Sequence, residues 1–164
     1  MKKRESGFTL IELLIVIAII GILAAIAIPN LLNAVQRGKQ KRSMSDMRTL
    51  ATAIEAYAVD NNLYPPANCP TGTWASSNAP VQLGSTSSFS LLSPTYVAQP
   101  PTKDGWQNLF FYKVDTTAGQ HYALASGGRN LVLDSLVCGT TTNFNDDIYY
   151  SDGTFIQWPE GSQN

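Results

Sequence analysis

Charged side chains are scarce in this 164-residue chain. Asp, Glu, Lys and Arg make up 14% of it, against about 25% in an ordinary soluble domain. The formal net charge at pH 7 is -1, so the composition gives no basic footprint of the kind that nucleic-acid binding requires. We therefore predict no nucleic-acid partner.

Residues that carry catalytic chemistry are also few. His121 is the only histidine, it falls in a predicted strand, and no catalytic motif surrounds it. The sequence contains no GxSxG, HExxH, CxxC or glycine-rich phosphate loop. Because an active site needs several such groups together, we do not expect an enzyme.

The two cysteines, Cys69 and Cys138, lie far apart in the sequence. No nearby histidine or further cysteine completes a zinc site. In an oxidising compartment this pattern favours a single disulfide between them. A pair of buried free thiols is the alternative.

Hydrophobic residues are concentrated near the N-terminus. Basic residues at positions 2 to 4 precede an apolar segment from Phe8 to Ile28, whose polar members are Thr9 and Glu12. A helix of about 20 apolar residues spans a bilayer, and the basic residues would stay in the cytoplasm. The run is longer than the core of a secretory signal peptide and lacks a convincing cleavage region after it. We predict a single span, with the bulk of the chain in the periplasm or beyond.

Glu12 is unusual because a carboxylate inside a membrane helix costs about 2.5–3.5 kcal/mol on insertion scales. One interpretation is an acid close enough to the interface to stay hydrated. The other is a buried ion pair. If the chain were cut after Gly7, Phe8 would gain an amino group four residues before Glu12, and the amine of a neighbouring copy could also reach it. An unmatched charge in hydrocarbon would then favour polymerisation in one axial register.

The string from Gly7 to Leu13, GFTLIEL, and the segment from Ile19 to Pro29 resemble the processing and assembly signature of type IV pilins and type II secretion pseudopilins. The resemblance implies that prepilin peptidase cuts between Gly7 and Phe8.

The same resemblance implies N-methylation of the new Phe8 amine. It makes Glu12 the assembly glutamate and Pro29 the proline that bends or melts the helix in filaments. The implied organisation is a leader at 1–7, a transmembrane and assembly helix at 8–30, and a periplasmic domain at 31–164.

A helix is predicted to continue beyond Pro29 to Val59 and to end at Asp60–Asn62. Its apolar residues recur at spacings of three and four: Met44, Met47, Leu50, Ala51, Ile54 and Ala58. Residues 65–100 are expected to form a loop with one helical turn near Phe89–Leu92.

Strands are predicted at 109–114, 121–126, 131–137, 148–150 and 154–158, and Asp152-Gly153 predicts a tight hairpin between the last two. The expected fold class is α+β and pilin-like. A long N-terminal helix, its first half transmembrane, would pack on a small antiparallel β-sheet.

Two later segments resemble the major pseudopilin of type II secretion. One is PTKDGWQN at 101–108; the other is YALASG at 122–127 with Asp146–Ile148, which is similar to that family's calcium loop. The resemblance implies a Ca²⁺ site. The segment offers several oxygen atoms, and calcium takes six to eight oxygen ligands. The implied ligands are Leu124, Ser126, Asn130, Asp146 and Asp147.

This sequence departs from the calcium-loop pattern. Asn130 stands where the family has an acid, and the long insertion from Leu131 to Asn145 carries Cys138. The alternative is that the acids at 146 and 147 cap or solvate a strand end.

Three functions remain open. The first is a subunit of a type II secretion pseudopilus that supports export of folded proteins. The resemblance implies a helical homo-oligomer, prepilin peptidase, an inner-membrane platform protein, a cytoplasmic assembly ATPase and minor pilins or pseudopilins as partners. The second is a type IV pilin of a surface fibre for adhesion, motility or DNA uptake. The third, a membrane-tethered periplasmic enzyme or binding protein, predicts no cleavage at Gly7 and no dependence on Glu12.

Overall fold

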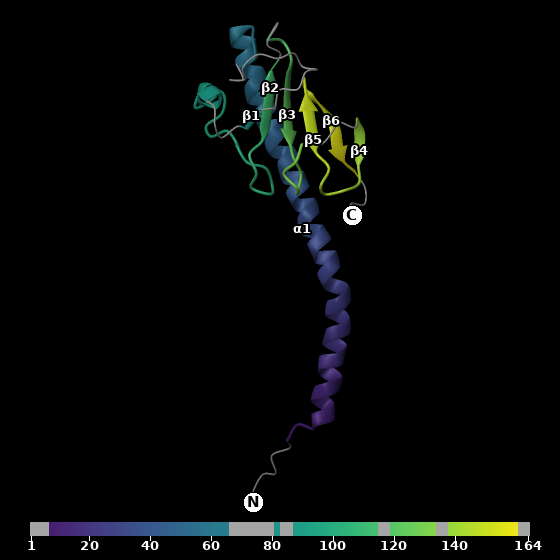
Figure 1. The fold of residues 1–164 in the computed structure, drawn as a ribbon. Coiled ribbons are helices and arrows are strands. Elements are labelled where there is room, and N and C mark those ends of the chain that lie inside the picture. The colour runs from purple at the N-terminus through teal and green to yellow at the C-terminus, as the bar shows by residue number, and fades with distance from the viewer. Residues whose placement is uncertain (1–6, 66–80, 83–86, 115–118, 134–137, 161–164) are drawn as a thin grey trace, which may run out of the picture. The chain divides into compact units, whose positions relative to one another are not determined.

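The computed structural model describes residues 7–65, 81–82, 87–114, 119–133 and 138–160. These residues form the long helix α1 (Leu10–Asn61), the short 3-10 helix η2 (Ser87–Leu91) and a six-stranded sheet. The chain divides into two compact units, residues 1–35 and 36–164. Within the second unit, α1 lies along the sheet (Figure 1). The predicted α+β, pilin-like fold is confirmed.

The second half of α1 is amphipathic, as predicted. Its buried residues follow a spacing of three and four, which puts them on one face of a helix: Gln40, Ser43, Met47, Leu50, Ala51, Ala53 and Ile54. Met44 and Ala58, at the edges of the predicted stripe, are half-buried. The helix ends at Asn61, one residue before Asn62 adopts a left-handed φ of 58°, which is a common way to terminate a helix.

The strands lie in the order β1-β2-β3-β5-β6-β4. Their bounds are β1 (Val81–Gln82), β2 (Phe111–Val114), β3 (Tyr122–Ser126), β4 (Gly139–Thr141), β5 (Ile148–Ser151) and β6 (Thr154–Pro159). β1, β2, β3, β5 and β6 pair antiparallel in turn, whereas β4 pairs with β6 in parallel. The sheet is therefore mixed, and the prediction of a wholly antiparallel sheet misses its last pair.

The core lies between α1 and the central strands. Tyr112 of β2, Leu124 of β3 and Tyr150 of β5 are opposite one another in register and are buried in one cluster with Leu50 and Ile54 of α1. Phe89 of η2 joins this cluster and meets the Tyr112 ring edge-on. Side chains that alternate along three neighbouring strands thus cover the apolar stripe of the helix.

Two buried tyrosines of the sheet donate hydrogen bonds to α1 and to the segment that follows it. The Tyr122 hydroxyl donates to Glu55 Oε1 of α1 at 2.6 Å, and the Tyr112 hydroxyl donates to the carbonyl oxygen of Pro65 at 2.9 Å. Burial raises the pKa of both phenols above their ordinary value. Both therefore stay protonated at neutral pH and act as donors.

The predicted strand at 131–137 is wrong in its described part. Leu131 lies in a turn with a φ of 66°, and its N–H donates to the carbonyl oxygen of Gly127 at 3.0 Å. Residues 131–133 form no strand, and residues 134–137 lie outside the described part of the chain. The strand of this region is β4, whose Gly-Thr-Thr sequence has no hydrophobic alternation to reveal it.

The other predicted strands are confirmed within two residues, and η2 confirms the predicted helical turn. Asp152 and Gly153 both have positive φ, 46° and 89°. This is the combination that a two-residue hairpin turn requires. The predicted hairpin between β5 and β6 is therefore confirmed. β1 lies within residues 65–100, where the sequence predicted a loop and no strand.

We predict that Leu50→Ala destabilises the domain by about 2–5 kcal/mol, because a fully buried leucine is replaced by a cavity in the centre of the core. Urea unfolding of the full chain in detergent measures the loss. Thr49→Ala, at the adjacent exposed position, is the matched control and should change stability by about 0.5 kcal/mol or less. Equal effects of the two variants would contradict the assigned helix face.

Candidate assembly site

The first turn of α1 is closed by a reciprocal pair of side chains. Thr9 precedes the helix, and Glu12 is its third residue. The Thr9 N–H and Oγ1 donate to Glu12 Oε2 at 2.9 and 2.7 Å, and the Glu12 N–H donates to Thr9 Oγ1 at 3.3 Å. This is a capping box, in which two backbone donors at the helix start are satisfied by side chains.

The capping box gives Glu12 a partner inside its own chain. From the sequence, water or an amine was considered as the partner of this carboxylate and Thr9 was missed, although the spacing T-x-x-E before an apolar run is a known helix-start signal. Gly7 and Phe8, the residues of the predicted cleavage site, are both exposed, and Phe8 has 79% of its surface accessible. Cleavage, methylation of Phe8 and the pairing of its amine with Glu12 stay predictions.

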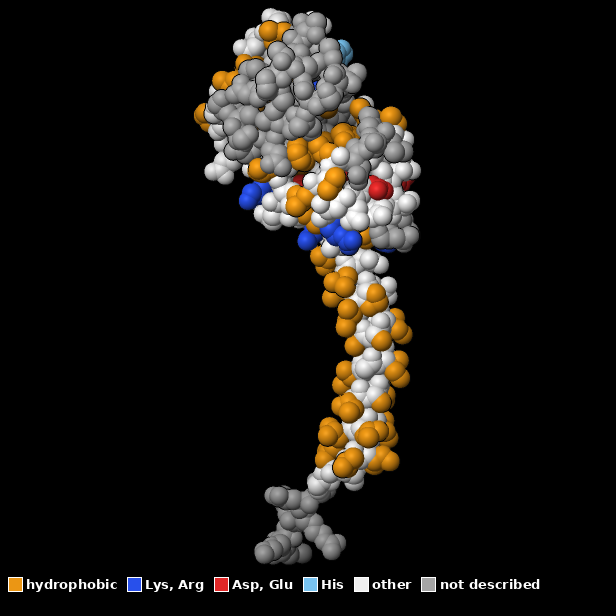
Figure 2. Space-filling model, in the orientation of Figure 1, with side chains coloured by type: hydrophobic (Ala, Val, Ile, Leu, Met, Phe, Trp, Pro, Cys, Tyr) orange, Lys and Arg blue, Asp and Glu red, His pale blue; other side chains and the backbone are white. Residues whose placement is uncertain are grey.

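The N-terminal part of α1 exposes a continuous apolar surface. α1 is long and apolar enough to cross a membrane, with a mean hydropathy of 3.0 over its most apolar window, and none of that window is buried within the chain. Figure 2 shows hydrophobic side chains over this part of the helix. The exposed residues include Leu10, Ile11, Leu13, Leu14, Ile15, Val16, Ile17, Ile19, Ile20, Ile22, Leu23, Ile26, Ile28, Leu31, Leu32 and Val35. A surface of this kind requires lipid or other helices around it.

Pro29 lies inside α1, and the helix continues on both sides of it. Proline lacks the N–H that would bond the carbonyl of Ala25, four residues earlier. One residue further on, the Asn30 side-chain amide donates to the carbonyl oxygen of Ile26 at 3.1 Å. This polar contact supports the helix next to its weak point. Bending or melting at Pro29 in a filament stays a prediction.

Asp104 organises the loop at 102–108, which connects α1 to the sheet. Its side chain is fully buried. Oδ1 accepts the backbone N–H groups of Trp106 and Asn108 at 2.8 and 2.9 Å, and Oδ2 accepts the hydroxyl of Ser126 in β3 at 2.7 Å. Burial raises the pKa of Asp104, while these three hydrogen bonds oppose the rise.

The same loop docks directly on α1. The Gly105 N–H donates to Ser43 Oγ at 2.9 Å, and Trp106 Nε1 donates to Gln36 Oε1 at 2.7 Å. A Cβ atom at position 105 would overlap the carbonyl oxygen of Lys39. Glycine is therefore required there by close approach of two backbones. Sequence reasoning found this loop by resemblance, and the structure gives it a physical task, which is to hold α1 against β3.

The residues predicted to bind calcium lie near one another, but several already have other partners. Leu124 is in the middle of β3 with β2 and β5 on either side, so its backbone carbonyl faces a neighbouring strand. The Ser126 hydroxyl bonds Asp104. Asn130 Oδ1 accepts the Val132 N–H at 3.2 Å. Each of these oxygens therefore already has a partner within the chain, and binding of calcium by them stays a prediction.

Asp146 and Asp147 precede β5. Asp146 Oδ2 accepts the Asn143 N–H at 3.2 Å, and Asp147 is fully buried, with its carbonyl accepting Gln157 Nε2 at 2.9 Å. Within the described ranges no group of three or more His, Cys, Asp or Glu residues could hold a metal. Calcium binding stays a prediction, with Asp146 as its most accessible carboxylate.

The predicted disulfide stays untested as well. Cys138 is exposed at the start of the segment that leads into β4. Cys69 lies outside the described residues.

Two family models match the chain, one over the apolar N-terminal segment and one over most of the remainder. Residues 2–28 match the model of the prokaryotic N-terminal methylation motif. Residues 30–135, which include the 102–108 loop, match the model of type II secretion system protein G. No solved structure matches the chain.

Individual relatives resemble part of the chain. It is 45% identical over 64 residues to type II secretion system core protein G of Aeromonas hydrophila, an alignment that covers 39% of this chain and 45% of the relative. It is 38% identical over 65 residues to the same-named protein of Escherichia coli, covering 40% and 45%. It is also 55% identical over 60 residues to type IV major fimbrial protein FimA of Dichelobacter nodosus, covering 37% and 38%. The chain thus aligns with less than half the length of these relatives.

We predict that Asp104→Ala costs about 2–4 kcal/mol, because it removes the acceptor of two partly buried N–H groups and of the buried Ser126 hydroxyl. Asp104→Asn should cost less at pH 7, since its carbonyl oxygen still accepts the Trp106 and Asn108 N–H groups. Urea unfolding of the full chain in detergent compares the two. Equal losses in both variants would contradict the role of the carboxyl oxygen as an acceptor.

The raised pKa of Asp104 adds a pH dependence. The native state binds this proton more tightly than the unfolded state, so stability that depends on Asp104 increases as pH falls through the raised native pKa. The stability of the wild type relative to Asp104→Asn should therefore grow between pH 7 and about pH 4. A difference that shrinks over this range would be inconsistent with burial as the dominant influence.

Calcium binding predicts a rise in melting temperature when CaCl₂ replaces EGTA, because a ligand that binds only the native state stabilises it. Differential scanning fluorimetry of the full chain measures it, with MgCl₂ as the ionic control. Asp146→Asn should abolish the rise and Asp152→Asn, in the β5–β6 turn, should retain it. An identical melting temperature in calcium and EGTA would refute the calcium prediction.

Proposed function

Since the chain belongs to the family of type II secretion system protein G, we propose that it is a filament subunit of a type II secretion pseudopilus. It supports export by polymerising rather than by catalysing a reaction. The observation that carries this proposal is the apolar surface of α1 from Leu10 to Val35, which nothing in its own chain covers. Lipid covers this surface before assembly, and the helices of other subunits cover it afterwards.

The precursor is a single-pass protein of the inner membrane, with its N-terminus in the cytoplasm and the second unit in the periplasm. Basic residues before the span support this orientation. Prepilin peptidase removes residues 1–7, as the methylation motif at 2–28 supports, and Phe8 becomes an N-methylated N-terminus. An inner-membrane platform protein, a cytoplasmic ATPase and minor pseudopilins are the proposed assembly partners.

Glu12 fixes the register between subunits through its charge. All the hydrogen bonds that described residues make to its side chain use Oε2. Oε1 can therefore accept the Phe8 amine of a neighbouring subunit while the capping box stays closed. In a medium of low dielectric an unpaired carboxylate costs several kcal/mol, so addition of a subunit is favoured in the position that brings the amine to Glu12.

A surface type IV pilus is the alternative, supported by the 55% identity to a fimbrial protein. The extent of the matched family model favours the secretion pseudopilus. The family model of protein G extends through residue 135, well beyond the N-terminal signal that both classes share. It also includes the 102–108 loop, whose Asp104 and Gly105 hold α1 to the sheet.

The test is assembly of the full chain in cells that carry prepilin peptidase and the assembly machinery. We predict a mature product that starts at methylated Phe8 by intact mass and N-terminal sequencing. Glu12→Ala and Glu12→Gln should both be cut, and both should lower filament yield by at least about tenfold, the effect of losing about 1.4 kcal/mol per subunit contact.

Glu12→Gln is the matched control for the capping box, because glutamine serves equally well at this position of the box but carries no charge. A wild-type yield of filaments from Glu12→Gln would show that the charge of Glu12 is not needed for assembly. That result would contradict the register mechanism. An uncut wild-type chain would sink the proposed function itself and favour a tethered periplasmic protein.

A further inference from the structure

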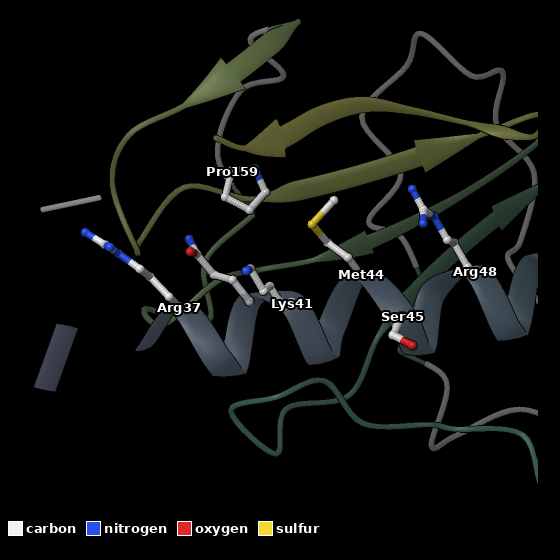
Figure 3. A pocket seen from close by; sticks show the side chains of 7 residues that line it. Arg37, Lys41, Met44, Ser45, Arg48 and Pro159 are labelled. Carbon is white, nitrogen blue, oxygen red and sulfur yellow. The ribbon is translucent and has the colours of Figure 1, made fainter. Parts of the chain in front are cut away.

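A basic groove lies between α1 and the C-terminal end of β6. Its volume is about 570 Å³, within the range of sites that hold small molecules. Arg37, Lys41 and Arg48 of α1 line it together with Met44 and Pro159. Figure 3 shows that the three cations and Met44 project from the side of the helix on which Pro159 lies.

The described residues that line the groove bring three cations and no acidic side chain. The ion pairs among described residues are Arg42–Asp46 and His121–Asp152, and neither includes a cation of the groove. Arg48 lies 5.1 Å from the centre of the Phe155 ring, a contact that orients a guanidinium and leaves its charge in place.

Cations gathered in this way repel one another, and a bound anion removes that cost. Arginine presents a planar fork of donors that fits phosphate, and lysine adds a compact point charge. Ser45, which also lines the groove, offers a hydroxyl. Met44 and Pro159 provide apolar contact next to these polar groups. This combination suits a phosphate attached to a partly apolar molecule.

The position of the groove in the chain indicates where that phosphate comes from. No residue from Leu13 to Gln36 is charged, and the exposed apolar residues of this stretch end at Val35. About 20 residues are enough to cross the hydrocarbon core. The residue after this stretch is Arg37, and Lys41 follows one helical turn later. If residues 8–30 span the bilayer, Arg37 and Lys41 follow within roughly 16 Å of helix, and their long side chains can reach back to the lipid headgroups.

We propose that the groove binds the phosphate of an anionic phospholipid, such as phosphatidylglycerol, in the periplasmic leaflet. The proposal rests on the membrane anchoring described above and goes beyond it, because it assigns a lipid site to the folded domain. Arg37 and Lys41 hold the phosphate, and Met44, one turn further along α1, contacts the rest of the headgroup. The bound lipid fixes the depth of the subunit before it enters a filament.

The experiment uses the full mature chain reconstituted in nanodiscs that contain equal amounts of phosphatidylglycerol and phosphatidylcholine. Native mass spectrometry after release counts the lipids retained by each protein. The wild type should retain phosphatidylglycerol preferentially. The double variant Arg37→Gln/Lys41→Gln should lower its retention by roughly thirtyfold, the combined effect of two cations at an anionic surface.

Lys103→Gln/Arg129→Gln is the matched control, because both of its positions are exposed on the same domain and the net charge changes equally. It should retain the lipid as the wild type does. Equal retention of the two lipids by the wild type, or an equal loss in the control, would overturn the proposal. Inorganic phosphate added at the lipid concentration should not displace the lipid, and displacement would mean a site for free phosphate.

Two further readouts separate this proposal from others. Membrane anchoring is measured by resistance to carbonate extraction, which every variant should keep; a wild-type chain that is extracted would refute the anchoring first. Normal lipid retention by the groove variant together with a loss of filaments would refute the lipid site. It would indicate that the groove contacts another subunit in the filament.

Discussion

The buried carboxylate of Asp104 is the interaction on which the arrangement of helix and sheet depends. Its two oxygens accept hydrogen bonds from the Trp106 and Asn108 N–H groups of its own loop and from the Ser126 hydroxyl in β3. The loop so formed places the Gly105 backbone against α1, where no side chain would fit. Without it, the apolar stripe and the Tyr122–Glu55 hydrogen bond would still hold the helix on the sheet, but the contacts of the loop with Gln36 and Ser43 would be lost.

Much of the fold was readable from the sequence because its signals are periodic. The stripe around Leu50 has helical spacing, and β2 alternates half-buried and buried residues. The Asp152-Gly153 turn was predictable because Asp-Gly is a typical sequence of two-residue hairpin turns. β4 was missed because Gly139–Thr141 has neither alternation nor apolar residues, and its pairing with β6 is set by tertiary contact. The turn at Leu131 was missed because leucine gives no hint of a positive φ.

The site was predictable to a lesser degree, for a different reason. Glu12 was conspicuous because a charge stands out in an apolar segment. Its bond to Thr9 is less conspicuous, because a threonine at the start of a helix gives a weak signal beside a charge in an apolar segment. The calcium ligands were inferred residue by residue from resemblance, which ignores what each oxygen already bonds. Leu124 and Ser126 are the instructive cases, since one belongs to a central strand and the other to the Asp104 network. Which hydrogen bonds an oxygen already makes depends on its neighbours in space, and these cannot be read from the sequence.

The place where the loop meets α1 has a mechanical consequence. Gln36, Lys39 and Ser43, which contact the loop, precede the large apolar residues of the stripe along the helix. Tension applied from the N-terminal end therefore reaches these contacts first. Two hydrogen bonds join the helix to the loop, one from Trp106 to Gln36 and one from Gly105 to Ser43. A pull along the helix axis therefore loads both bonds at the same time, in shear. A subunit drawn along its axis would transmit force to the sheet through this loop before the core behind it is strained.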